Sequence, residues 1–159
     1  MTPEPGGPEL PALPWARREV DEIAAQLPAG SPHVLVETSA SETDVRAKLA
    51  GMDLLHFATH GVIQQQRALS SFLALRGGGP DAAHDGRLTA EEVYGLSLQA
   101  RLVVLSACST ALGPMTGDGV IGFTRAFLYA GASSVIATEW AVPDEAGYDP
   151  KAAALHAAD

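Results

Sequence analysis

Apolar residues near the start of the chain follow the period of an α-helix. From Trp15 to Leu27 they recur at spacings of three and four, with charged residues between them. This pattern predicts an amphipathic helix with one buried face. The helix is expected to stop at Pro28, because proline lacks the backbone N–H that would continue it.

Further helices are predicted from the signals at their ends. The segments 41–44 and 89–92 each begin with Ser or Thr and carry an acidic residue three positions later, which is the pattern of a capping box. Residues 120–130 form a mostly apolar stretch that stops at Gly131, and glycine is common just past a helix end. We therefore expect helices that open at Ser41 and Thr89 and one that closes at Gly131.

Short apolar runs lie between the predicted helices. Residues 53–59 and 101–107 are mostly apolar on both faces, and residues 133–138 form a third such run. This pattern is typical of parallel strands that helices cover on both sides. Residues 34–36 and 71–75 are predicted as two additional short strands.

Strands that alternate with helices at this spacing predict an α/β fold with right-handed crossovers and a mostly parallel sheet. The Gly- and Asp-rich stretch that starts at residue 77 is expected to be a flexible loop. In such folds, ligands collect beyond the carboxyl ends of the strands. The candidate chemistry is therefore expected where residues 53–59 and 101–107 end.

Length and charge limit the possible functions. The 159 residues suffice for one ordinary domain. The 19 acidic and 10 basic residues give a formal charge of -9, which repels phosphate backbones and anionic membrane surfaces. We therefore expect neither nucleic acid nor a membrane as a partner. Lysines are few, whereas Ala and Gly are abundant, a bias that is typical of GC-rich bacterial genomes.

The cysteine count and the first residues indicate a cytoplasmic location. A single cysteine cannot form an internal disulfide, so nothing points to an oxidising compartment. The first eleven residues are rich in proline, glycine and glutamate and lack the basic and apolar regions of a signal peptide. Residues 1–12 are expected to be a disordered leader, because this composition disfavours both helices and strands.

Two residues with suitable chemistry follow the two central strands. His60 comes directly after residues 53–59, and Cys108 comes directly after residues 101–107. If the strands are neighbours, both side chains meet at one sheet edge, where an imidazole can take the thiol proton and later protonate a leaving amine. The backbone N–H groups of Gly61 and Cys108 are candidates for stabilising an oxyanion.

The same residue types also have structural interpretations. A lone cysteine is more often a small buried residue, and a histidine at a strand end often has a structural role. His56 lies inside a strand and is interpreted as a core histidine with a hydrogen-bonded ring, whereas His33, His84 and His156 fall in loops or in the tail. His56 and His60 would converge on a helix but not along a strand, so no metal site is predicted.

Residues 117–122 read G-x-G-x-x-G, and Glu139 ends the next strand about twenty residues later, near where a ribose-binding acid belongs. A dinucleotide site needs the first glycine directly after a strand, but the preceding strand ends near residue 107. Asp118 would also bring negative charge towards a pyrophosphate. We therefore interpret Asp118 and Gly119 as a helix-capping turn and expect no cofactor.

Three longer segments are distinctive when taken together. They are DLLHFATHG at residues 53–61, LVVLSACST at residues 102–110 and GDGVIGFTRAFLYAGA at residues 117–132. Together they resemble the CHAT domain family. They occur in the family's order and spacing, and the resemblance runs from about Leu13 to Ala146. CHAT domains are caspase-like, separase-related cysteine peptidase domains that are often attached to tetratricopeptide repeats.

The resemblance implies a caspase-like three-layer α/β sandwich and a cysteine endopeptidase that acts on a protein substrate. His60 and Cys108 match the catalytic dyad of the family. The family segment Trp-x-Val-x-Asp matches Trp140 to Asp144, and in separases its aspartate helps to bind a basic residue before the scissile bond. Asp144 is thus the candidate S1 carboxylate for Arg or Lys; the alternative is a surface aspartate in a Pro-containing turn.

The chain differs from the usual family pattern at both ends. The CHAT-like domain is expected over residues 13–146, with residues 147–159 as a short irregular tail where CHAT domains usually continue with a long helix. Since no repeat array precedes the domain, a separate regulatory or repeat-containing protein is the expected partner. The alternative function is a proteolytically inactive scaffold or interaction module that needs a partner chain. The reactivity of Cys108 distinguishes the two functions.

Overall fold

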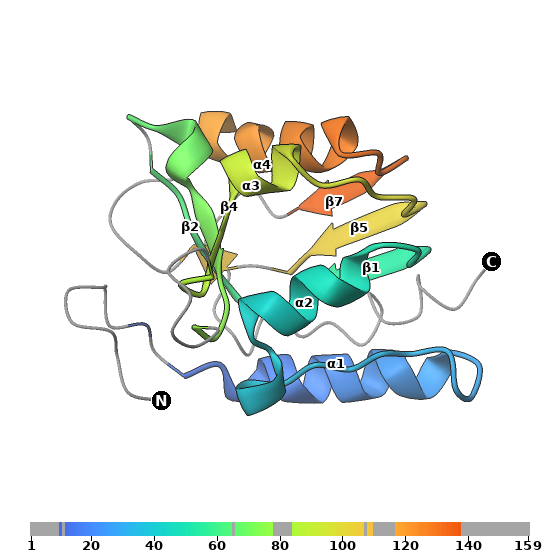
Figure 1. The fold of residues 1–159 in the computed structure, drawn as a ribbon. Coiled ribbons are helices and arrows are strands. Elements are labelled where there is room, and N and C mark those ends of the chain that lie inside the picture. Colours follow the sequence, from blue (N-terminus) through green and yellow to red (C-terminus); the bar gives the residue numbers. More distant parts are fainter. Residues whose placement is uncertain are drawn as a thin grey trace.

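The computed structural model describes residues 10, 12–64, 66–77, 84–106, 108–109 and 117–137. Helices and strands alternate along most of this range (Figure 1). In chain order the elements are α1 (Pro14–Gln26), η1 (Glu37–Ser39), α2 (Glu42–Leu49), β1 (Leu54–Phe57), β2 (His60–Val62), η2 (Ala68–Ser70), β3 (Phe72–Ala74), β4 (Arg87–Thr89), α3 (Ala90–Tyr94), β5 (Leu102–Leu105), β6 (Cys108–Ser109), α4 (Gly117–Tyr129) and β7 (Val135–Ala137).

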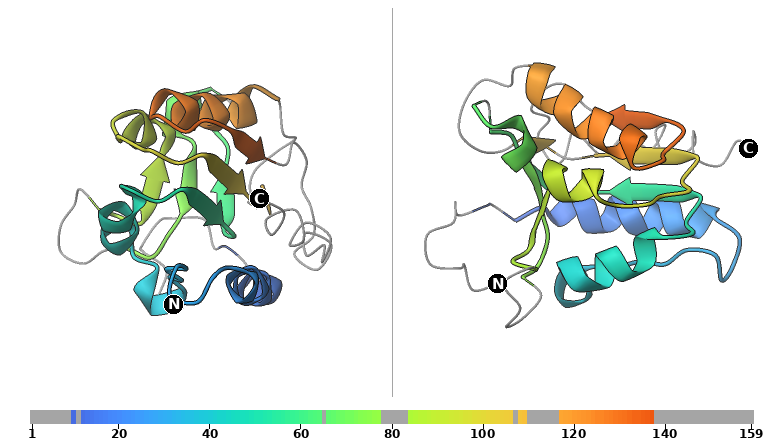
Figure 2. Two further views of the ribbon diagram at one scale, coloured as in Figure 1. Left: turned by 90° about the vertical axis from the view of Figure 1, so that its right-hand side faces the viewer. Right: turned by 45° about the horizontal axis from the view of Figure 1, so that its top comes forward.

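The central sheet has the order β1-β5-β7, and all its pairings are parallel. Helix α1 lies on the side of this sheet away from α3 and α4 (Figures 1 and 2). The predicted α/β class with a parallel sheet is confirmed, and the architecture is consistent with a caspase-like α/β fold. The expected strands 53–59, 101–107 and 133–138 are β1, β5 and β7, each shorter than its apolar run.

A second sheet stands at a steep angle to the first and has the order β4-β3-β2-β6 (Figure 1). Its β2 and β6 strands are parallel, whereas β3 is antiparallel to both β2 and β4. One face of this sheet carries Leu73 and Leu88, which pair across β3 and β4 and are both buried. The core is therefore shared by the two sheets.

The core lies between this face, the central sheet and helices α2, α3 and α4. Apolar burial of this extent is the main force that holds the layers together. Two aromatic rings of the core, Phe57 and Phe127, have centroids 5.7 Å apart. The buried cluster comprises Val45, Leu49, Leu55, Phe57, Leu73, Leu88, Ala90, Val93, Leu98, Ala100, Val103, Leu105, Phe123, Ala126, Phe127, Ala130 and Ala132.

The helix-capping signals are confirmed. The Ser41 hydroxyl accepts the N–H of Asp44 at the start of α2. At the start of α3, Thr89 accepts the N–H of Glu92, and the Glu92 carboxylate accepts the N–H of Thr89 in return. This reciprocal bonding satisfies N–H groups that the first helical turn leaves without a partner.

Two expectations about secondary structure are wrong. Residues 34–36 form no strand; Val34 is exposed, and the run is too short to hold an extended conformation without a neighbouring strand. Helix α4 begins at Gly117, so Asp118 and Gly119 lie inside its first turn rather than in a capping turn before it.

A carboxylate of α2, Glu42, is fully buried where α2 meets the β3–β4 hairpin. It accepts the N–H of Gly86 at 3.0 Å and a guanidinium N–H of Arg46 at 3.2 Å. The same guanidinium is 3.1 Å from Glu92, which connects α2 to α3. Burial raises the pKa of Glu42 above its ordinary value of 4.5, although the Gly86 N–H acts in the opposite direction.

We expect the free energy of unfolding of the wild type, relative to Glu42→Gln, to fall as the pH rises from about 4.5 towards neutrality. With a raised pKa, the folded protein holds the Glu42 proton in a pH range where the unfolded chain has released it, so rising pH favours unfolding. The slope cannot exceed about 1.4 kcal/mol per pH unit for one proton. Urea denaturation at several pH values measures it.

The control for this comparison is Glu91→Gln, which removes an exposed carboxylate from the same region. Its stability should run parallel to that of the wild type over the same pH range. A wild type that gains stability over Glu42→Gln with rising pH would show that the bonds from Gly86 and Arg46 outweigh burial.

Candidate active site

Two neighbouring strands are interrupted at the same level. Strand β1 ends at Phe57 and β2 begins at His60, while β5 ends at Leu105 and β6 begins at Cys108. Phe57 pairs with Leu105, and His60 pairs with Cys108. The backbone pairing therefore resumes in the same register after the interruption, and both strands pass from the central sheet into the second one.

The continued register makes His60 and Cys108 direct backbone partners. Neighbouring strands lie about 4.8 Å apart, so these two positions are brought together at the carboxyl end of the central sheet. The condition for this proximity, that the strands of residues 53–59 and 101–107 are neighbours, is met by the pairing of β1 with β5. The structure adds one feature: His60 and Cys108 each begin a further short strand, and β3 gives β2 an additional antiparallel partner.

His60 sits in a well-packed part of the second sheet. Its side chain is 6% exposed, and the following Gly61 and Val62 are also buried. The hydroxyl of Thr59 donates a hydrogen bond to the carbonyl of Ala74, which links the interruption to β3. A buried imidazole on a packed strand keeps one position, and catalytic groups need such rigid support.

Ser71 connects the elements that flank this region. Its side chain is fully buried, and its hydroxyl accepts the N–H of Gln64 at 2.9 Å. Its backbone carbonyl accepts the N–H of Ala90 at 2.8 Å. The end of β2, the start of β3 and the start of α3 are thereby joined through one buried residue, with its polar groups satisfied.

The other described histidines have separate environments. His56 Nε2 lies 2.9 Å from a carboxylate oxygen of Glu19, which joins β1 to α1 and confirms the interpretation of a core histidine with a hydrogen-bonded ring. His84 is hydrogen-bonded to Thr43, and His33 is exposed. Among the residues that the structure describes, no group of three or more His, Cys, Asp or Glu side chains is placed to hold a metal ion.

Several sequence-based assignments lie outside the described residues. These include Asp144, Glu139 and His156, and the expected leader and tail. The G-x-G-x-x-G segment lies within α4, and seven residues separate its first glycine from the end of β6. This distance is incompatible with the tight strand-to-helix turn of a dinucleotide site. Within the described ranges, no helix is long and apolar enough to cross a membrane.

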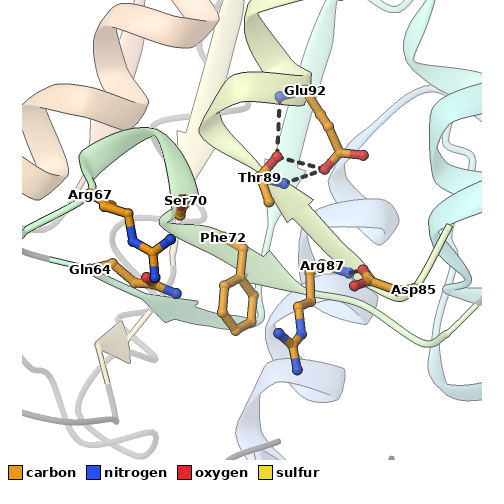
Figure 3. Close-up of a pocket in the computed structure, with 8 residues that line it drawn as sticks. All are labelled: Gln64, Arg67, Ser70, Phe72, Asp85, Arg87, Thr89 and Glu92. Atoms are coloured by element: carbon orange, nitrogen blue, oxygen red, sulfur yellow. Dashed lines mark hydrogen bonds between the residues drawn. The ribbon is translucent and has the colours of Figure 1, made fainter. Parts of the chain in front are cut away.

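Sequence analysis missed a polar pocket next to β3 and β4. Arg67, Arg87 and Phe72 line it (Figure 3). The available signal was the alternation Arg87, Leu88, Thr89, in which the middle residue is apolar and its neighbours are polar. Three residues are too few to distinguish a strand from a loop in isolation, so only the pairing with β3 reveals which side chains share a face.

Comparison with known proteins identifies the family. The CHAT domain family matches residues 6–149, which is most of the chain. Tetratricopeptide repeat protein 28 of Homo sapiens is 31% identical over 179 aligned positions, covering 87% of this chain. The mouse protein of the same name is 48% identical over 56 residues, covering 35% of this chain.

The chain spans only 7% and 2% of the length of these two relatives, respectively. Both relatives are mammalian proteins, so they do not support the bacterial origin that the composition predicts. Their similarity is to one part of a much longer protein. The match to the family itself is independent of them and extends over all the elements described above. The chain belongs to the CHAT domain family.

Proposed function

We propose that this CHAT domain is a cysteine endopeptidase, with Cys108 as the nucleophile and His60 as the general base and acid. The observation that carries the proposal is the direct backbone pairing of His60 with Cys108 on adjacent parallel strands. A nucleophile and its base must lie within hydrogen-bond reach, and neighbouring positions on paired strands provide this proximity. The family membership supports the same assignment.

In the proposed reaction, His60 takes the proton of the Cys108 thiol, and the thiolate attacks the carbonyl carbon of the scissile peptide bond. The negative charge that develops on the carbonyl oxygen is stabilised by the backbone N–H groups of Gly61 and Cys108. The imidazolium then gives its proton to the leaving amine as the C–N bond breaks. Water, deprotonated by His60, hydrolyses the remaining thioester and restores the thiol.

Asp144 is proposed as the carboxylate that binds an Arg or Lys side chain before the scissile bond. A guanidinium fits a carboxylate with two parallel charge-assisted hydrogen bonds, which makes such a pair selective for a basic residue. This assignment rests on the match of Trp140 to Asp144 with the family segment. Substrates with Arg or Lys at this position are therefore the first to test.

A repeat-containing segment or protein is proposed to work with this domain. The two relatives are named as tetratricopeptide repeat proteins, and each is far longer than this chain. Repeat arrays offer extended concave binding surfaces. Such a surface would bring a protein substrate to the dyad, so activity on a protein can depend on a component that short peptides do not need.

The dyad is tested by labelling the thiol of the folded protein. Iodoacetamide is expected to alkylate Cys108, and His60→Ala is expected to slow this reaction by about 3- to 10-fold at neutral pH, because an imidazole partner increases the thiolate fraction. His33→Ala, which removes an exposed histidine, is the matched control and should label at the wild-type rate. Mass spectrometry of timed samples gives the rates.

Equal rates in wild type and His60→Ala would contradict the dyad. Complete protection of Cys108 in the folded protein, with rapid labelling after denaturation, would favour the inactive scaffold. The protein has a single cysteine, so every labelled molecule reports on Cys108 alone.

A further inference from the structure

An open pocket of about 530 Å³ lies against the second sheet, between η2 and the β3–β4 hairpin (Figure 3). The ring of Phe72 lies between the side chains of Arg67 and Arg87 in this view, and Gln64 adds an amide beside Arg67. The pocket thus has an aromatic surface with a guanidinium on each side. Its volume is large enough for one or two side chains of a bound peptide.

The pairing of the strands places this pocket on the same face of the sheet as His60. Side chains two residues apart on a strand share a face, as do those of directly paired residues. His60 therefore shares a face with Val62, Val62 with its partner Phe72, and Phe72 with its partner Thr89. Arg87, two residues before Thr89, lies on the same face.

The separation of the pocket from His60 suits an extended peptide. Phe72 lies on β3, the strand next to β2, and it pairs with Val62, which is two residues after His60. With about 3.3 Å per residue and 4.8 Å between strands, this corresponds to roughly 8 Å. An extended peptide covers that distance in two or three residues.

The charges at the pocket favour an anionic group. Within the described part of the chain, neither Arg67 nor Arg87 forms an ion pair with a carboxylate. The guanidinium carbon of Arg87 lies 5.3 Å from the centre of the Phe72 ring, which orients it without neutralising it.

Both carboxylates that line the pocket have other partners. Glu92 caps α3 and pairs with Arg46, and Asp85 accepts the backbone N–H of Arg87 at 2.9 Å. Their own charges are therefore partly compensated. The lining thus holds two arginines and two carboxylates, and of these four groups only the two guanidinium groups are left, among the described residues, without an ion pair or a charge-compensating contact of this kind.

We propose that this pocket is a substrate subsite that receives an Asp or Glu side chain two to four residues from the scissile bond. The inference rests on the proposed peptidase function and adds a second specificity element to it. Arg67 and Arg87 donate charge-assisted hydrogen bonds to the substrate carboxylate, and Phe72 packs against its methylene groups. A basic residue at the scissile bond and an acidic residue nearby would then be recognised together.

The test uses quenched fluorescent peptides with arginine fixed before the scissile bond and with Asp, Asn, Glu or Gln placed in turn at the second to fourth positions on either side. At one or two adjacent positions, we expect wild-type kcat/KM to be roughly 10- to 100-fold higher with Asp or Glu than with the matching amide. The double variant Arg67→Gln with Arg87→Gln should bring this ratio close to one. With a lysine peptide added to the set, Arg87→Glu should shift the preference at that position towards lysine.

The charge-matched control is Arg101→Gln. Arg101 is exposed and lies at the opposite end of β5 from Cys108, so this variant removes one positive charge far from the pocket. It should keep the wild-type ratio of acidic to amide substrates. The single variant Arg87→Gln, which removes one positive charge at the pocket, is measured beside it. If both variants changed the ratio of acidic to amide substrates equally, net charge would explain the effect, and the proposal would be overturned.

A binding measurement separates this proposal from the peptidase assignment. Fluorescence anisotropy of the same peptides with Cys108→Ala protein requires no turnover. Tighter binding of the acidic peptides that disappears in Arg67→Gln with Arg87→Gln would support the subsite even if no peptide is cleaved. Cleavage with equal rates for Asp and Asn peptides, in wild type and in pocket variants, would overturn the subsite and leave the dyad intact.

Discussion

Cys108→Ala is expected to lose peptide hydrolysis completely, and His60→Ala is expected to lose about 10²- to 10⁴-fold in kcat. In the proposed mechanism, the first variant lacks the attacking atom, and the second lacks the group that moves the proton to the leaving amine. Their effects should not add, because the two residues act as one unit. The double variant should therefore be no less active than Cys108→Ala. Initial rates on peptides with arginine before the scissile bond measure these effects.

His33→Ala serves as the control for histidine removal, since His33 is exposed and lies outside the two sheets. Circular dichroism of each variant checks whether the fold is retained. His60→Ala with wild-type kcat would remove His60 from the mechanism. Cys108→Ala that still cleaves peptides would overturn the nucleophile assignment itself.

Gly131→Ala is expected to destabilise the domain by about 3 kcal/mol or more. Gly131 has a φ of +114°, and a Cβ atom there would lie 2.3 Å from the carbonyl oxygen of Leu98. The N–H groups of Gly131 and Ala132 bond to the carbonyls of Leu128 and Phe127, which closes α4 in a Schellman motif. An alanine would either strain this end of α4 or push it away from the segment that carries Leu98.

The matched control for this substitution is Gly122→Ala in the same helix. A Cβ at Gly122 would make an ordinary contact of 3.6 Å with the side chain of Ala68. Alanine is the better helix former, so this variant should be neutral or more stable by up to about 1 kcal/mol. Urea denaturation measures both variants. A Gly131→Ala variant with the wild-type midpoint would show that the end of α4 adapts to a side chain.

The central strands could be predicted from the sequence because their apolar runs are short and lie between segments with helix signals. Residues 53–59 and 101–107 are mostly apolar on both faces, which is typical of strands that helices cover on both sides, and they are too short for typical buried helices. From the sequence, the proximity of His60 and Cys108 followed only on the condition that these two strands are neighbours, which the pairing of β1 with β5 meets. The exact pairing of these two residues did not follow from the sequence, because register depends on how two distant segments align.

Of the second sheet, only β3 was predicted, as the strand 71–75. The other three strands could not be predicted, because they are two to three residues long. Segments this short carry too few positions for a period to be recognised, and they are ordered by pairing with their neighbours. The pocket at Arg67 and Arg87 has the same origin. These two arginines are 20 positions apart in the chain and share one pocket only because β3 pairs with β4.

The most direct test of the proposed peptidase function is covalent capture by a substrate-like inhibitor. A short peptidyl acyloxymethyl ketone with arginine at the reactive end should form one adduct per molecule at Cys108, detected by mass spectrometry of the intact protein and its peptides. The adduct should be absent or form far more slowly in His60→Ala, while His33→Ala should match the wild type. Wild-type protein that reacts with iodoacetamide but never with the peptidyl inhibitor, or His60→Ala that is captured at the wild-type rate, would contradict a His60–Cys108 peptidase.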